Sequence, residues 1–246
     1  MRTYLLIKIN SSAVFVSDTH LNDSSPETIA KFINFLEKNV SNYDCLFILG
    51  DLFDWWIGDD TNQFPQITIA LKKLSKSMNI YFIAGNRDFF IGKGFEKKTG
   101  IQILKDPTLI QLGNKKTILL HGDTLCVDDK KYQKFRTIAR SIIVKKIYLN
   151  LPLVLRQYIF KAVRKKSDEG KKSKNIEIMD VNQAAVENLF NEFNCPPLMI
   201  HGHTHRPKKH YYNFNNKHCE RWVLNDWYDS ESFLLWDKKK LKVVNI

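Results

Sequence analysis

Short apolar runs along the chain alternate with segments in which apolar residues recur every three or four positions. Runs at 14–16, 45–49 and 80–84 have the length and the β-branched or aromatic content of buried strands. The segments between them, 26–39 and 67–78, show helical periodicity. Alternation of strand and helix is typical of α/β layered folds, in which sheets pack against helices. We therefore expect an α/β protein.

The second half of the chain adds further predicted strands, at 117–120, 198–200, 222–224, 232–236 and 242–244. A long segment between the first two of these has a different pattern. It is predicted to hold two helices broken near residues 150–152, a Lys/Ser/Gly-rich loop at 165–175 and another helix from about Ile176. We expect this segment to be an insertion rather than a separate domain.

The interrupted pattern divides the chain into a core, 1–127 and 192–246, and a helical segment, 128–191, which we call the cap. The N-terminal apolar run is short and contains Lys8, which favours a short extension or edge strand over a signal peptide. No stretch approaches 18 consecutive apolar residues, so we expect no transmembrane helix and place the protein in the cytoplasm.

Positive charge is concentrated in the cap. The chain has 38 Lys or Arg and 26 Asp or Glu, a formal net charge of +12 at pH 7. Between Lys130 and Lys174 there are 15 basic and two acidic residues, a local net charge of +13. This pattern indicates an anionic partner and leaves nucleic acid, anionic lipid and a phosphorylated substrate open. The four cysteines form no CxxC pair, so we expect buried free thiols rather than a zinc finger or a disulfide framework.

Polar residues follow five of the predicted strands at the point where each strand ends. They are Asp18 and His20, Asp51, Asn86, His121, and the pair His203 and His205. Carboxylate, amide and imidazole groups suit Mn²⁺, Zn²⁺ or Fe²⁺, and ligand sites in open α/β sheets gather at the carboxyl ends of strands. Each motif alone is weak support, because a lone buried histidine is more often a hydrogen-bonded core residue than a ligand. The five together, in this order, predict a dinuclear metal centre.

The ordered motifs resemble the pattern of the calcineurin-like metallophosphoesterases, which is DxH, GDxxD, GNH(D/E), an isolated His and GHxH. The resemblance implies a four-layer α/β fold with two packed mixed β-sheets flanked by helices. It also implies that one ion is held by Asp18, His20, Asp51 and His205, and the other by Asp51, Asn86, His121 and His203, with Asp51 bridging the two. His201 has no ligand role in that pattern, and we expect it to be structural or to support a ligand.

The ligand set indicates hydrolysis by a metal-activated water. Two cations about 3.5–4 Å apart bind one hydroxide between them and aim it at phosphorus, so no side-chain nucleophile is needed. Residue 87 is arginine where the superfamily has the histidine usually assigned to protonation of the leaving group. A guanidinium does not donate a proton at neutral pH, but it binds phosphate oxygens through two hydrogen bonds, which suits a pyrophosphate. We expect Asp51, Asn86, Arg87 and His203 to take part in catalysis.

The runs at 50–60, 85–90, 121–126, 179–183 and 201–207 are similar to those of the bacterial UDP-2,3-diacylglucosamine diphosphatases of lipid A synthesis. This resemblance spans nearly the whole chain, cap included, but not the first dozen residues. It implies hydrolysis of the pyrophosphate bond with two Mn²⁺ ions, water attack on the α-phosphorus, and UMP and 2,3-diacylglucosamine 1-phosphate (lipid X) as products. The substrate-binding residues carried over are Asn86, Arg87, Asp129, Ser167, Lys171, Lys174 and His203. Lys171 departs from the family's usual Asn, which leaves its role open.

An apolar stripe flanked by cations runs along the cap. The stripe consists of Ile142, Ile143, Ile147, Leu151, Leu155, Ile159 and Val163, and the flanking cations are Lys145, Lys146, Arg156, Lys161, Arg164 and Lys165. Such a surface suits acyl chains and anionic headgroups, so we expect a monomer bound peripherally at the cytoplasmic face of the bacterial inner membrane. The stripe is equally suited to packing the cap on the core.

Two other functions remain open. A metal-dependent nucleic-acid phosphodiesterase would also use a basic segment, but the cations here are interleaved with aliphatic rather than stacking aromatic residues. We therefore expect no nucleic-acid partner. A non-catalytic scaffold of the same fold should have lost ligand positions, and none of the predicted ligands is replaced.

Overall fold

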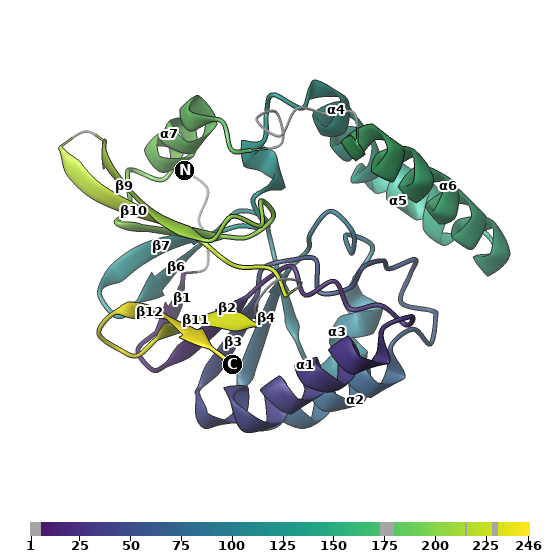
Figure 1. Ribbon diagram of the computed structural model, residues 1–246, viewed down its shortest axis with the longest axis horizontal. Helices are drawn as coiled ribbons and strands as arrows, with labels where there is room; N and C mark the ends of the chain where they lie inside the picture. Colours follow the sequence, from purple (N-terminus) through teal and green to yellow (C-terminus); the bar gives the residue numbers. More distant parts are fainter. Residues whose placement is uncertain (1–5, 173–179, 215, 228–230) are drawn as a thin grey trace.

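Two six-stranded β-sheets form the centre of the molecule (Figure 1). The computed structural model describes residues 6–172, 180–214, 216–227 and 231–246, with the side chains of 166–172 outside the description. The first sheet has the order β12 (Leu241–Asn245), β11 (Ser232–Trp236), β2 (Ala13–Val16), β3 (Cys45–Ile48), β4 (Asn79–Ile83), β5 (Gln102–Leu104). The second has the order β1 (Ile7–Ile9), β6 (Thr108–Leu112), β7 (Lys115–Leu119), β8 (Leu198–His201), β10 (Lys217–Val223), β9 (Lys208–Phe214).

Both sheets are mixed. Strands β2, β3, β4 and β5 run parallel, whereas β11 pairs antiparallel with β2 and β12. In the second sheet β7, β8 and β10 run parallel, whereas β6 and β9 are antiparallel to their neighbours β7 and β10. Parallel strands that follow one another in this way end at one edge of their sheet, and this edge carries the predicted ligands.

The central strands of both sheets are apolar on both faces because they are covered on both sides. Between them, the rings of Phe15, Phe47 and Tyr81 stack across three adjacent strands, with centroids 5.0 and 4.8 Å apart. The outer face of the first sheet is covered by α1 (Pro26–Lys38), α2 (Pro65–Leu74) and α3 (Lys93–Thr99), and that of the second by α7 (Gln183–Glu192). The predicted four-layer α/β fold is confirmed.

Most predicted elements lie where the apolar pattern placed them. The exceptions among the core helices are α2, which begins at Pro65 and ends at Leu74 rather than spanning 67–78, and the short α3, which was not predicted. Strands β5, β6 and β9 were also missed, because they are only partly buried and lack a continuous apolar run. In the described part of the N-terminal run, Ile7–Ile9 form an edge strand, as expected.

The cap holds three helices before residue 173, not two. They are α4 (Lys130–Ala139), α5 (Ile142–Leu149) and α6 (Leu153–Lys172), and Figure 1 shows them on the side of the molecule opposite to α1 and α2. The break near 150–152 is confirmed. The additional break falls where the Ser141 side chain accepts a hydrogen bond from Val144 N (3.3 Å) and begins a new helix.

The predicted loop at 165–175 and the helix from about Ile176 are wrong in the described residues. Helix α6 continues to Lys172, because Lys, Glu and Ala are good helix formers and no proline interrupts them. Helix α7 begins only at Gln183, where Asn182 accepts a hydrogen bond from Ala185 N (3.2 Å) as its N-cap residue. None of the helices in the described ranges is long and apolar enough to cross a lipid bilayer.

The residues of the apolar stripe of the cap differ in burial. Leu151 and Ile159 pack against the main core cluster, whereas Ile142, Ile143 and Ile147 are 85%, 72% and 61% exposed. The packing interpretation therefore holds for Leu151 and Ile159, whereas a lipid-facing role of the exposed residues stays a prediction.

Three of the six flanking cations turn toward the core instead of toward solvent. Lys145 Nζ donates to Phe89 O (2.8 Å), Arg156 pairs with Asp60, and Arg164 pairs with Asp54. These three therefore bind the core in the structure, because their long side chains reach acceptors on the core loops. Lys146, Lys161 and Lys165 are exposed.

Candidate metal centre

The predicted ligands meet at the edge where the two sheets end. Asp18, Asp51 and Asn86 follow β2, β3 and β4 of the first sheet. His121 follows β7 of the second sheet, and His203 and His205 follow β8. Parallel strands that end together thus carry side chains from residues 18 to 205 into one place.

Several ligand positions have a backbone conformation that side chains rarely adopt. The residues are Asp18, His20, Asp51, His203 and His205, with φ angles between 46° and 71°. Such a conformation costs free energy at a non-glycine residue and is typical of functional sites, where the surrounding contacts enforce it. Here Asp18 N donates to Gly50 O and His20 N to Asp51 O, both at 3.0 Å, which fixes the loop after β2 on the loop after β3.

Glycine is required where the loops pass the ligands. A Cβ on Gly85 would lie 2.1 Å from Asp51 Oδ1, and one on Gly202 would lie 2.2 Å from Asp18 Oδ2. The buried Asp88 carboxylate accepts hydrogen bonds from Gly85 N and Leu52 N, both at 2.8 Å. These contacts explain the glycines of the GN and GH motifs and the second acid of the run at 85–90.

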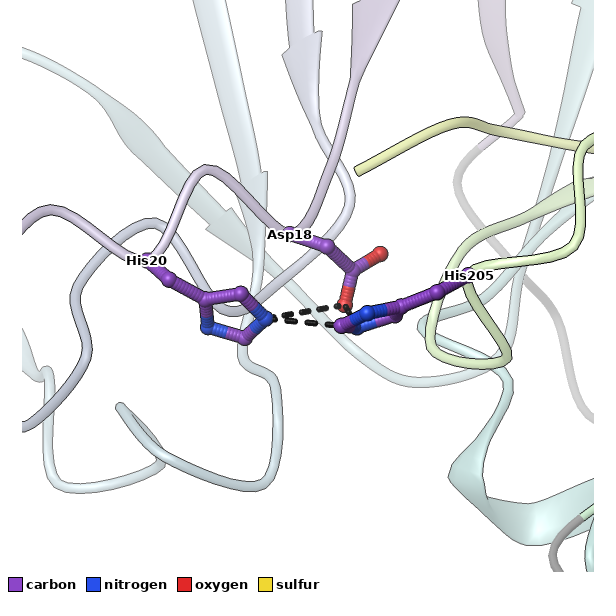
Figure 2. A group of neighbouring side chains, drawn as sticks. All are labelled: Asp18, His20 and His205. Carbon is purple, nitrogen blue, oxygen red and sulfur yellow. Dashed lines mark hydrogen bonds and ion pairs between the residues drawn. The ribbon is translucent and has the colours of Figure 1, made fainter. Parts of the chain in front are cut away.

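The first ligand group contains Asp18, His20 and His205, which point toward one another from two separate loops (Figure 2). His20 Nε2 lies 3.3 Å from His205 Nε2, and Asp18 Oδ1 lies 3.5 Å from His205 Nε2. One ligand atom from each residue lies within 4.8 Å of the others. Two ring nitrogens and a carboxylate oxygen converging in this way form half of a coordination shell for a divalent cation.

The second ligand group contains Asp18, Asp51 and His121, whose ligand atoms also lie within 4.8 Å of one another. His121 Nε2 lies 3.8 Å from Asp51 Oδ1 and 3.0 Å from Asn86 Oδ1. Its Nδ1 lies 2.9 Å from Leu49 O, which fixes Nδ1 as the protonated nitrogen and turns Nε2 toward the acids.

The remaining predicted ligand, His203, lies beside the second group, with its ring centroid 4.9 Å from that of His121. Asp51 also reaches toward the first group, with Oδ2 3.9 Å from His20 Nδ1. The structure therefore brings all seven predicted ligands to one edge. Which carboxylate bridges the two ions stays a prediction, because Asp18 and Asp51 both lie between the groups.

Charges at the site are arranged as a cation site requires. Burial raises the pKa of Asp18, but the adjacent His205, His121 and His20 lower it well below its usual value. Burial lowers the pKa of His121, but the charges of Asp51 and Asp18 raise it to about 9. The positive charge of protonated histidines can thus balance the carboxylates. A bound divalent cation would displace these protons and supply the positive charge instead. The donor set of carboxylate, amide and imidazole groups fits such an ion.

Arg87 lies beside these ligands, with its side chain 17% exposed. Its backbone N donates to Asp51 Oδ1 (2.9 Å), and its Nε lies 3.6 Å from Asp51 Oδ2. Its Nη1 donates to Asp54, which is buried in the loop after β3. A fixed guanidinium next to converging metal ligands is suited to binding phosphate oxygens.

The predicted substrate residues of the cap are placed only in part. Asp129 is buried and acts as the N-cap residue of α4, accepting a hydrogen bond from Tyr132 N (3.1 Å). The side chains of Ser167 and Lys171, and Lys174 altogether, lie outside the described residues. Their roles stay predictions.

His201 agrees with its structural interpretation. The ring is buried, with Nε2 2.9 Å from Arg221 Nη1 and Nδ1 2.8 Å from Gly202 O. Burial and the charge of Arg221 lower its pKa to about 3, which keeps the ring neutral. It therefore supports the loop that carries His203 and His205.

Two residues of the site were missed from the sequence. Asp226 Oδ2 lies 2.7 Å from His205 Nδ1, so this carboxylate orients the ring whose Nε2 faces Asp18. It follows a predicted strand within two residues, and the strand-end rule that found the other acids could have found it. Asp123, in the run at 121–126, is buried and pairs with Arg136 (2.7 Å) and Arg140 (3.3 Å), which joins α4 to the metal centre.

Comparison with known proteins shows which family has this combination of fold and site. The model of the calcineurin-like phosphoesterases matches residues 12–226. Curated relatives named UDP-2,3-diacylglucosamine hydrolase match almost the whole chain. The relative from Aromatoleum aromaticum is 42% identical over 92% of this chain and 93% of its own, and that from Haemophilus ducreyi is 44% identical over 92% and 96%. The relative from Haemophilus influenzae is 44% identical over 87% of this chain and 89% of its own. The chain therefore belongs to the calcineurin-like phosphoesterase family, in the branch that contains the UDP-2,3-diacylglucosamine hydrolases.

Proposed function

We propose that the protein hydrolyses the pyrophosphate bond of UDP-2,3-diacylglucosamine to UMP and 2,3-diacylglucosamine 1-phosphate (lipid X), a step of lipid A synthesis. The observation that carries this proposal is the position of Arg87, whose guanidinium lies beside two overlapping groups of metal ligands. The ligands account for hydrolysis of a phosphorus ester or anhydride, and Arg87 favours a diphosphate. The names of the relatives point to the same substrate.

The proposed site holds two Mn²⁺ ions, one on Asp18, His20, Asp51 and His205 and the other on Asp51, Asn86, His121 and His203. The ions supply a water of lowered pKa and neutralise charge on the phosphoryl oxygens. The chain supplies the orientation: Leu49 O fixes the ring of His121, Asp226 fixes that of His205, and Arg87 binds the phosphate oxygens. Water would attack the α-phosphorus. The leaving group, 2,3-diacylglucosamine 1-phosphate, is already a phosphate and would need no proton donor.

The segment 128–191 acts in this proposal as the lipid-facing part of the enzyme. The exposed apolar residues Ile142, Ile143 and Ile147 lie on α5, near the exposed Lys146. Apolar side chains with neighbouring cations suit the surface of an anionic membrane. We infer that the protein works peripherally at the cytoplasmic face of the inner membrane, as a monomer.

The test is release of UMP from UDP-2,3-diacylglucosamine by purified protein with Mn²⁺. The wild-type protein should release UMP, and Asp51→Asn, which removes the carboxylate charge that we propose to bind both ions, should not. Absence of release by the wild type, together with efficient cleavage of nucleic acid or simple phosphodiesters, would overturn the proposal. A steep loss of nucleic-acid affinity with salt would then favour a nucleic-acid phosphodiesterase.

A further inference from the structure

The buried carboxylate of Asp54 is shared by two arginines from different parts of the chain. Asp54 lies in the loop after β3, and its side chain is 5% exposed. It accepts hydrogen bonds from Arg87 Nη1 and from Asn22 Nδ2 (3.0 Å), and Arg164 Nη2 lies 2.8 Å from its Oδ2. Its backbone N donates to Leu21 O (2.9 Å), which fixes the loop itself. One rigid acid thus contacts both guanidinium groups.

The two arginines belong to different parts of the proposed enzyme. Arg87 follows β4 and contacts Asp51, a predicted metal ligand. Arg164 lies on α6, in the cap, and holds Asp54 twice, because its Nη1 also donates to Asp54 O (2.8 Å). Asp54 is therefore a point where helix α6 of the cap and the catalytic centre share a side chain.

The charge of Asp54 connects the positions of Arg87 and Arg164. The Asp54 carboxylate lies between the two guanidinium groups and lowers the repulsion between them, and Asp51 Oδ2 lies 3.6 Å from Arg87 Nε. Without Asp54, the two cations would repel each other more strongly, and Arg87 would lose the charged hydrogen bond from its Nη1. Both arginines thus bind the same acid, and a shift of one changes the surroundings of the other.

We propose that Asp54 is a positioning residue that couples the docking of helix α6 to the orientation of Arg87. The proposal rests on the proposed function, in which Arg87 binds the diphosphate of the substrate. Removal of either the acid or the cap arginine should then change turnover, although neither needs to contact the reacting atoms.

A second ion pair provides a matched control. Arg156, also on α6, donates to Asp60 Oδ1 (2.7 Å) and to Ile57 O (2.9 Å). This pair joins the same helix to the same loop but does not involve Arg87. A variant of Asp60 therefore reports on the attachment of the helix alone.

The experiment compares Asp54→Asn, Arg164→Gln, their double variant and Asp60→Asn on UDP-2,3-diacylglucosamine with Mn²⁺. We expect Asp54→Asn to lower kcat by about 10- to 100-fold, since Arg87 loses a charged hydrogen bond and its alignment. Arg164→Gln should lower kcat by about fivefold or more, and the double variant should be no slower than Asp54→Asn, because both changes break one coupling. Asp60→Asn should stay within about threefold of the wild type.

Two further measurements separate positioning from general damage. Hydrogen exchange in residues 153–165 should become faster in both Asp54→Asn and Asp60→Asn, whereas kcat should fall only in the first. Bound Mn²⁺ should remain at the wild-type level in Asp54→Asn, because its side chain is not among the predicted ligands. Should Asp54→Asn fail to fold, the comparison of Arg164→Gln with Asp60→Asn decides the question.

Any of three results would overturn the proposal. The first is wild-type turnover in Asp54→Asn or, if that variant does not fold, in Arg164→Gln. The second is a double variant in which the losses of kcat at positions 54 and 164 multiply, and the third is a loss of kcat in Asp60→Asn equal to that in Asp54→Asn. The wild type is assayed first, so that failure of the proposed function is seen separately. If the wild type releases no UMP, the same set of variants is assayed on bis(4-nitrophenyl) phosphate. The hydrogen-exchange comparison can be made in either case, because it needs no substrate.

Discussion

Replacement of Ile143 and Ile147 by serine tests whether α5 faces a lipid surface. The two side chains are 72% and 61% exposed, so they contribute little to the folded core. Surface substitutions of this kind usually change the free energy of unfolding by less than about 0.5 kcal/mol. We expect the double variant to unfold at the same temperature as the wild type.

The expected loss of membrane affinity follows from the exposed area. Transfer of a whole isoleucine side chain out of water is worth about 1.5–3 kcal/mol, so the exposed parts of these two would each contribute about 1–2 kcal/mol on entering the bilayer interface. The double variant should therefore bind anionic vesicles about 30-fold more weakly, or worse. The measurement is co-sedimentation with vesicles of phosphatidylglycerol and phosphatidylethanolamine.

The control is Ile69→Ser on α2, since Ile69 is 67% exposed and α2 lies on the opposite side of the molecule from α5 (Figure 1). This variant should bind vesicles as the wild type does. Equal binding by the Ile143/Ile147 double variant and the wild type would refute the assignment of this face to lipid. A large loss of thermal stability in the double variant would show instead that a protein surface covers these residues.

Three further predictions concern the metal centre and its supports. Arg87→Ala should lower kcat at least about 100-fold while changing the stability by less than about 1 kcal/mol, since Asp54 keeps Arg164; kinetics and thermal unfolding together check this. Asp226→Asn should weaken Mn²⁺ binding about 10- to 100-fold, because His205 loses its orienting partner; titration with Mn²⁺ checks this, and unchanged affinity would contradict it. Acid should release α4, because burial raises the pKa of Asp123 but the charges of His121, Arg140 and Arg136 lower it below its usual 3.8. A lowered carboxyl pKa gives stability that is present above 3.8 and is lost as the pH falls through the folded value, so Asp123→Asn should flatten the acid limb of the unfolding curve.

The fold and the meeting of the candidate ligands at one edge could be predicted from the sequence because both follow from the strands. A strand covered on both faces is a continuous apolar run, as at Cys45–Ile48, and the residue after such a run lies at the sheet edge. Local patterns say less about long side chains. Helical periodicity placed Arg156 and Arg164 beside the apolar stripe, but their acceptors lie 96 and 110 residues away in the chain.

The same limit explains the errors in the cap. The break at Ser141 depends on one side-chain hydrogen bond, and serine occurs in helices as well as at their ends. The end of α6 was placed too early because Ser167 and Gly170 suggest a loop, whereas the neighbouring lysines favour a helix. In both cases the local sequence has only a weak preference for helix or loop, and contacts with the rest of the protein determine where the helix begins or ends.

The geometry of the metal centre depends on the sandwich that surrounds it. Left-handed backbone at Asp18 and Asp51 is unfavourable for these residues on their own, so contacts from neighbouring loops must enforce it. Asp18 N is held by Gly50 O, and Asp18 Oδ2 accepts a hydrogen bond from His203 N (2.8 Å), which comes from the other sheet. These contacts leave no room for a Cβ at Gly202. A change that shifts one sheet against the other should therefore disturb the ligands before it unfolds the core, because their positions require both sheets at once.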